Sequence, residues 1–201
     1  MKTHKKTFLV GTAYFFLIFF LLLTLVSSPP FIGISSAVCA LFHEAAHILC
    51  ARAFGRKIKP LSFSPTGLYP DVGRGSTLSQ ILIYAAGPFV NLAICAVCLL
   101  VLRSNYSETV FSLFCVNAAL ALYNLTPVPF SDGGGIMRCV LTAFLGARVG
   151  GALCAMLELL FSFALFVFFS YRFFALGSGF FPFFCSFVFM LTSIQPHIAI
   201  T

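Results

Sequence analysis

The sequence predicts an all-α polytopic membrane protein with about six transmembrane helices, and three observations predict this fold class. Hydrophobic residues make up 60% of the 201 residues and charged residues only 8%. The mean hydropathy of +1.05 lies far above that of soluble domains with mixed surfaces. Long apolar runs recur along the chain, and the basic residues gather in alternate connecting segments, as the positive-inside rule requires.

The expected spans each approach the roughly 20 apolar helical residues that cross a bilayer core. The first, residues 7–26, follows a basic start. It is too long for the apolar region of a signal peptide, and residues 27–30 (SSPP) make a poor cleavage site, so an uncleaved span is expected. The remaining spans are expected at residues 31–54, 78–102, 109–125, 150–169 and 179–194.

The basic residues set the expected orientation. With the amino terminus inside, only Arg103 and Arg172 of the 12 Lys and Arg residues fall in outside segments. The chain is therefore expected to be a multi-pass protein of the cell membrane with both termini in the cytoplasm. The net charge of +7 follows from this topology. No basic cluster carries interleaved aromatic platforms, so no nucleic-acid partner is expected.

No charged stretch is long enough for a separate soluble domain, so residues 1–201 are expected to form a single integral-membrane domain. The polar stretch of residues 55–77 combines several prolines and glycines with short apolar pieces. It predicts a small β-hairpin or loop region at the cytoplasmic face, between the second and third spans. The eight Cys residues are scattered through apolar segments, which predicts packing roles and no disulfide framework.

One polar motif lies within the second span. Glu44 belongs to HEAAH at residues 43–47, at membrane depth, where an ionisable side chain is costly and is a functional hypothesis by default. On a helix, His43 and His47 project from one face with about 6 Å of rise between them. Both imidazoles can then reach one zinc ion while Glu44 serves as the general base. The alternative is a fortuitous buried polar cluster.

Two histidines leave a tetrahedral zinc site short of a third protein ligand. The short fourth span ends in NLTPVPFSDGGG at residues 124–135, where Pro127 and Pro129 cannot continue a helix. Such a break near the bilayer is tolerated only where it lines an enclosed or wet cavity. Asp132 in this broken helix is the candidate third ligand, against the alternative of a plain turn.

A third motif, GPFVN at residues 87–91, lies inside the third span. Its glycine and proline allow close helix approach, and Asn91 must find a polar partner in hydrocarbon. Helix packing and an active-site role both remain open for this motif.

These three motifs, in this order, closely resemble the site-2 protease family of intramembrane zinc metalloproteases (peptidase family M50). The resemblance covers a catalytic core of about residues 31–147. It implies one zinc ion per chain, with Asp132 as the third ligand beside His43 and His47. It also implies that Asn124 helps to bind the substrate backbone or the developing oxyanion, for which Asn91 is a second candidate. Residues 55–77 would then lie near the site and pair with an unfolded substrate segment by strand addition.

The compact plan looks most like the sporulation branch of that family, which releases a membrane-tethered pro-sigma factor. Two departures stand out: no PDZ domain separates the motifs, and no C-terminal regulatory domain is expected after them. The expected function is hydrolysis of a peptide bond in a membrane-tethered protein substrate such as a pro-sigma or anti-sigma factor. The site would open toward the cytoplasm, and a membrane regulatory or inhibitor protein is a further expected partner.

Three rival functions stand beside this one. A catalytically inactive membrane scaffold, or pseudoprotease, would bind membrane clients but has no physical need of Glu44. A zinc transporter would need polar residues along several spans, whereas the first, fifth and sixth offer little beyond Glu158. Other membrane proteases with an HExxH motif normally use Glu as the third ligand. For Glu158 itself, pairing with a basic group such as Arg148 and lining a water path both stay open.

Overall fold

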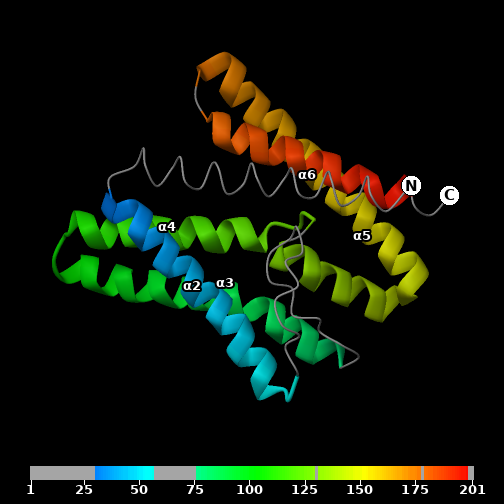
Figure 1. Cartoon of the computed structure of the whole chain (residues 1–201), viewed down its shortest axis with the longest axis horizontal. Helices are drawn as coiled ribbons and strands as arrows, with labels where there is room; N and C mark the ends of the chain where they lie inside the picture. The colour runs from blue at the N-terminus through cyan, green and yellow to red at the C-terminus, as the bar shows by residue number, and fades with distance from the viewer. Residues whose placement is uncertain (1–29, 57–75, 130, 178, 199–201) are drawn as a thin grey trace. The chain divides into compact units, whose positions relative to one another are not determined.

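In a computed structural model, the described residues are 30–56, 76–129, 131–177 and 179–198. Every regular element within these ranges is an α-helix, which confirms the predicted all-helical class for this part of the chain (Figure 1). The first expected span and nearly all of the expected hairpin region fall outside these ranges. The helices are α2 (Pro30–Ala53), α3 (Thr77–Ser104), α4 (Glu108–Leu125), α5 (Asp132–Leu176) and α6 (Phe180–Ile198).

Four of the described helices are long and apolar enough to cross a membrane. α6 carries a shorter apolar segment, Pro182–Ile194, so the predicted number of about six spans is not confirmed. Large apolar side chains face outward from the helices, for example Phe89 with 70% and Phe144 with 84% of its surface exposed. Such exposure suits helices whose surrounding solvent is lipid. The candidate spans are Gly33–Ala53, Thr77–Ser104, Glu108–Leu125 and Asp132–Leu176.

Helix α5 departs most from the expectation, because it begins at Asp132 and is 45 residues long. It contains one non-helical residue, Gly146, with φ of 77° and ψ of 163°. A positive φ of this kind is readily accessible only to glycine, so Gly146 joins two helical segments at a kink. A Cβ atom on Gly150 would lie 2.3 Å from the carbonyl oxygen of Leu141, so the two segments approach backbone to backbone beyond the kink.

An ion pair also links the two segments of α5. Nη2 of Arg138 donates to the two carboxylate oxygens of Glu158 at 3.0 and 3.2 Å, and Sγ of Cys154 donates to the same carboxylate at 3.3 Å. The side chain of Glu158 is only 4% exposed, whereas that of Arg138 is 56% exposed. The partner of Glu158 is therefore Arg138, where the sequence had suggested Arg148.

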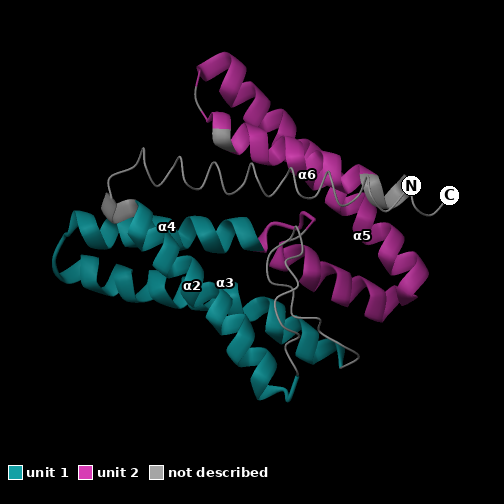
Figure 2. Cartoon of the chain, viewed as in Figure 1, with its two compact units in different colours: residues 1–124 teal, residues 125–201 magenta. Residues whose placement is uncertain are grey.

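The chain divides into two compact units, residues 1–124 and residues 125–201 (Figure 2). Within the first unit α2 packs against α3, and within the second α5 packs against α6. The boundary falls between the last two residues of α4, immediately before the segment that contains Pro127 and Pro129. The organisation as a single domain stays a prediction.

Candidate metal centre

The two histidines of the HEAAH motif lie one turn apart on the buried face of α2. His43 is 5% exposed and His47 is 6% exposed. Their imidazole rings meet edge to face at an interplanar angle of 79°, and their Nε2 atoms are 3.2 Å apart. Glu44 follows His43 directly and is half-buried. The helical spacing of the motif thus brings two imidazole nitrogens to one point, as the sequence predicts.

Hydrogen bonds at the Nδ1 atoms fix the proton positions in both rings. Nδ1 of His47 donates to the carbonyl oxygen of Ile83 at 2.7 Å, and Nδ1 of His43 lies 2.7 Å from Oδ1 of Asn91. Both oxygens accept, so each Nδ1 carries the ring proton and each Nε2 presents a lone pair. Two lone pairs facing each other at 3.2 Å repel unless a cation binds both. This arrangement is the one that zinc-binding histidines adopt.

Residues 87–91 of α3 shape the space beside the two imidazoles. A Cβ atom on Gly87 would lie 2.4 Å from Nε2 of His47 and 2.6 Å from Nε2 of His43. The missing side chain therefore keeps this space open. Pro88 is fully buried within the helix and has no N–H to donate to the preceding turn. One turn after Gly87, Asn91 is 1% exposed and directs its oxygen at His43.

These contacts bear on the two roles that the sequence left open for the motif. Asn91 both joins helices and supports a candidate ligand, since Nδ2 donates to Oδ1 of Asn117 at 3.0 Å while Oδ1 accepts from His43. Its expected contact with the substrate stays a prediction.

Gly87→Ala is expected to empty the metal site while leaving the fold intact. The added methyl group would displace the two imidazoles, and a misplacement of about 1 Å can cost about a hundredfold in rate. Alanine is also the better helix former by about 1 kcal/mol, so the helix itself should persist. Metal analysis of the purified protein should show most of the zinc lost. Gly151→Ala is the matched control, because a Cβ atom there meets nothing within 4 Å; full zinc content in Gly87→Ala would contradict this account of Gly87.

A tight turn precedes Asp132 in the second unit. The N–H of Val128 donates to the carbonyl of Thr126 at 2.8 Å, and the N–H of Ser131 donates to the carbonyl of Val128 at 3.3 Å. Ser131 is the N-cap of α5, and its Oγ accepts from the N–H of Gly134 at 3.0 Å. An N-cap serine satisfies one of the open N–H groups of the first turn. Asp132 is thereby fixed as the first helical residue, where the helix dipole favours a carboxylate.

The two glycines that follow Asp132 let this turn fold. A Cβ atom would lie 2.2 Å from the carbonyl oxygen of Leu125 if placed on Gly133, and 2.3 Å from that of Val128 if placed on Gly134. Backbone atoms cannot yield to such contacts as a flexible side-chain end can. Asp132 itself is half-buried and its Oδ2 atom is shielded from solvent. The Asp-Gly-Gly sequence therefore places one carboxylate on a first turn that has no room for neighbouring side chains.

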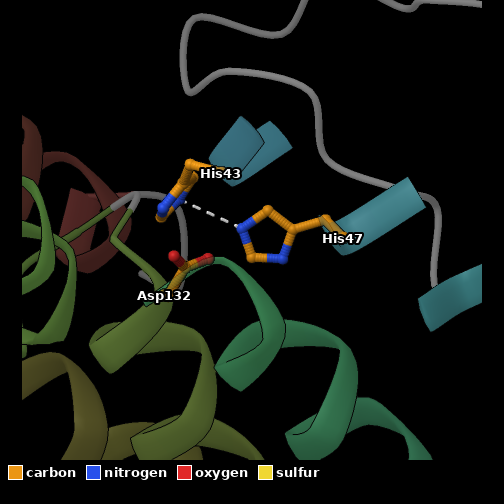
Figure 3. Close-up of side chains that lie close together, drawn as sticks. All are labelled: His43, His47 and Asp132. Carbon is orange, nitrogen blue, oxygen red and sulfur yellow. Dashed lines mark hydrogen bonds between the residues drawn. The ribbon is translucent and has the colours of Figure 1, made fainter. Parts of the chain in front are cut away.

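The donor set fits a zinc ion. One ligand atom each from His43, His47 and Asp132 lies within 4.8 Å of the other two (Figure 3). Ligands about 2.0–2.2 Å from a tetrahedral zinc are separated from one another by roughly 3.3 Å. The 3.2 Å between the imidazole Nε2 atoms matches that separation. Two neutral imidazoles and a carboxylate are also ligands that zinc prefers.

Two further asparagines lie on α4. Asn124, next to its last residue, is half-buried and donates from Nδ2 to the carbonyl of Leu120 at 3.0 Å. Its expected role in substrate binding stays a prediction. Asn117 is 0% exposed, and the sequence reasoning missed it. The signal was the same that singled out Asn91, an amide inside an apolar helix that must find a partner.

Comparisons with known proteins find a matching family, a curated relative and a similar solved structure. The family model for Peptidase M50B-like proteins matches residues 13–178. A zinc metalloprotease of Methanocaldococcus jannaschii is 29% identical over 110 residues, which are 52% of this chain and 32% of that protein. The chain thus spans about a third of the length of this curated relative.

A solved structure shows a similar fold. The site-2 protease from Methanocaldococcus jannaschii has a TM-score of 0.65 and 22% sequence identity, and the match covers 92% of this chain and 87% of that one. The family match, the zinc metalloprotease relative and the donor set of His43, His47 and Asp132 confirm the predicted kinship with zinc metalloproteases and the prediction of zinc as the cofactor. The chain belongs to the Peptidase M50B-like family.

Proposed function

We propose that this protein is an intramembrane zinc metalloprotease that hydrolyses a peptide bond of a membrane-associated protein. The observation that carries the proposal is the convergence of two lone-pair nitrogens 3.2 Å apart on a candidate membrane span, with a carboxylate as the third donor within 4.8 Å. His43, His47 and Asp132 would hold one zinc ion. Glu44 would be the general base.

The chemistry divides between the ion and the side chains. Bound zinc would supply a Lewis acid that polarises the scissile carbonyl and makes water a stronger nucleophile. Glu44 accepts a proton from the attacking water and delivers it to the leaving nitrogen, so that one C–O bond forms as the C–N bond breaks. Asn91 and the carbonyl of Ile83 hold the two imidazoles in the ligand tautomer. Asn124 is the proposed contact for the substrate backbone or the developing oxyanion.

The site's depth supports a membrane-associated substrate. His43 belongs to the candidate span Gly33–Ala53, nine residues before Arg52, which places it roughly 13 Å from the boundary that Arg52 marks. The distribution of basic residues favours a cytoplasmic opening. Lys57→Cys should then react with an impermeant thiol reagent only from the cytoplasmic side, and reaction from outside would reverse the orientation.

Within the substrate class, a membrane-tethered pro-sigma or anti-sigma factor is the finer proposal. It rests on the resemblance of the compact span plan to the sporulation branch. A membrane-bound regulatory or inhibitor protein would be the further partner.

Reconstituted cleavage tests the proposal. Purified protein in liposomes should cut a co-reconstituted single-span substrate at or within its membrane segment. A zinc chelator should stop the reaction, and added zinc should restore it, because the metal supplies the Lewis acid. Cleavage that continues undiminished after the metal is removed would show that the activity does not depend on zinc.

A further inference from the structure

Two asparagine side chains are buried together in the first unit. Asn91 on α3 is 1% exposed and Asn117 on α4 is 0% exposed. Burying an amide without hydrogen bonds costs roughly 2–7 kcal/mol, so such groups are retained only where they are satisfied. Both amides belong to one chain of hydrogen bonds that runs from the backbone of α4 to the imidazole of His43.

The backbone gives this chain of hydrogen bonds its direction. Nδ2 of Asn117 donates to the carbonyl oxygen of Leu113 at 2.9 Å, and this oxygen can only accept. The nitrogen of Asn117 must therefore face Leu113, which turns its Oδ1 toward Asn91. That oxygen accepts from Nδ2 of Asn91 at 3.0 Å. Oδ1 of Asn91 is then left facing Nδ1 of His43, where it accepts at 2.7 Å.

The two histidines differ in how their tautomer is set. His47 donates to the carbonyl of Ile83, an acceptor in every circumstance. His43 faces an amide, which can present either its oxygen or its nitrogen. If Asn91 presented its nitrogen, Nδ1 of His43 would have to accept and the ring proton would move to Nε2. That Nε2 atom would then have no lone pair for a metal.

We propose that Asn117 is a positioning residue, which holds Asn91 as a hydrogen-bond acceptor and thereby keeps Nε2 of His43 available to zinc. The proposal rests on the proposed zinc site and adds to it a residue that touches neither metal nor substrate. Partners of this kind, which orient metal ligands, typically contribute about 10- to 100-fold in metal affinity.

Asn117→Leu removes the amide that sets the orientation of Asn91, while keeping a side chain of similar size. Asn91 could then turn either face to His43, and we expect zinc affinity to fall about tenfold, measured by competition with a chelating dye on the purified full chain. Ser193→Ala is the control, because it removes a buried hydroxyl of the second unit that donates to Ser162. It should leave zinc affinity unchanged.

A double-mutant cycle separates positioning from packing. Asn91→Asp replaces the amide by a carboxylate, both of whose oxygens accept from His43, so direction is no longer needed. Its second oxygen would face Oδ1 of Asn117, a repulsive pair of acceptors. Adding Asn117→Leu to Asn91→Asp should therefore leave zinc affinity unchanged or raise it. In the protein with native Asn91, Asn117→Leu should lower zinc affinity.

The outcomes are distinct. The positioning role would be overturned if Asn117→Leu lowered zinc affinity equally in the native and the Asn91→Asp proteins. It would also be overturned if Asn117→Leu did not lower zinc affinity in the native protein. If Asn117→Leu fails to fold, Asn117→Ser serves in the same cycle, because a rotating hydroxyl both donates and accepts and imposes no direction. A wild-type protein that binds no zinc would instead overturn the proposed function itself.

Discussion

Replacing Glu44 with glutamine is expected to abolish cleavage while leaving fold and zinc content intact. The amide keeps the size of the side chain but cannot accept the proton of the attacking water. General acid–base catalysis contributes about 10²- to 10⁴-fold, so the rate should fall by at least the lower of these factors. The measurement is the initial rate of substrate cleavage in liposomes, with metal content determined on the same samples.

Glu108→Gln is the matched control for this experiment. Glu108 is an exposed acid in the first turn of α4, so the same change of charge and shape should leave the cleavage rate unaltered. A Glu44→Gln enzyme that cuts at nearly the wild-type rate would remove Glu44 as the base. A wild-type protein that binds membrane clients but never cuts them would favour the inactive scaffold.

Asp132→Ala is expected to lose zinc as well as activity. Two imidazoles and water bind the ion far less tightly than a site completed by a carboxylate. Asp132→Glu should rescue poorly, because one extra methylene moves the oxygen by about 1 Å, which can cost about a hundredfold in rate. Zinc per chain and the cleavage rate of both purified variants are the measurements.

Glu158→Gln is the control for Asp132→Ala, because it removes an acidic group of the second unit that is not a proposed zinc ligand. Glu158 is a buried acid of the second unit that pairs with Arg138. This substitution should lower stability and keep one zinc per chain. Zinc retained undiminished in Asp132→Ala would exclude Asp132 from the coordination shell, and the scaffold alternative predicts that Asp132→Ala changes only stability or client binding.

The sequence predicted most helix positions closely, because apolar runs end where polar residues or prolines begin. The span expected at residues 78–102 is found as Thr77–Ser104, and that expected at residues 109–125 as Glu108–Leu125. Of helix α5 only the later part was predicted, as the span at residues 150–169, because Arg138 and several glycines interrupt its first segment. The kink also depends on the positive φ of Gly146, which composition cannot reveal.

The candidate ligand residues of the site could be predicted from the sequence, but the groups that hydrogen-bond to the ligand histidines could not. Helical spacing alone brings His43 and His47 to one face. The partner of each Nδ1 depends on how α3 lies against α2, so neither Ile83 nor the alignment of Asn91 with His43 follows from one sequence. Gly87 illustrates the same limit, because its role beside the imidazoles exists only once two helices pack.

X-ray absorption at the zinc edge of the purified, detergent-solubilised protein tests the central claim most directly. The account predicts one zinc per chain, coordinated only by nitrogen and oxygen at about 2.0–2.2 Å, with two imidazole ligands. The eight cysteines of the chain offer a competing donor set. Sulfur neighbours at about 2.3 Å, or no bound zinc in a protein that cleaves its substrate, would contradict the account.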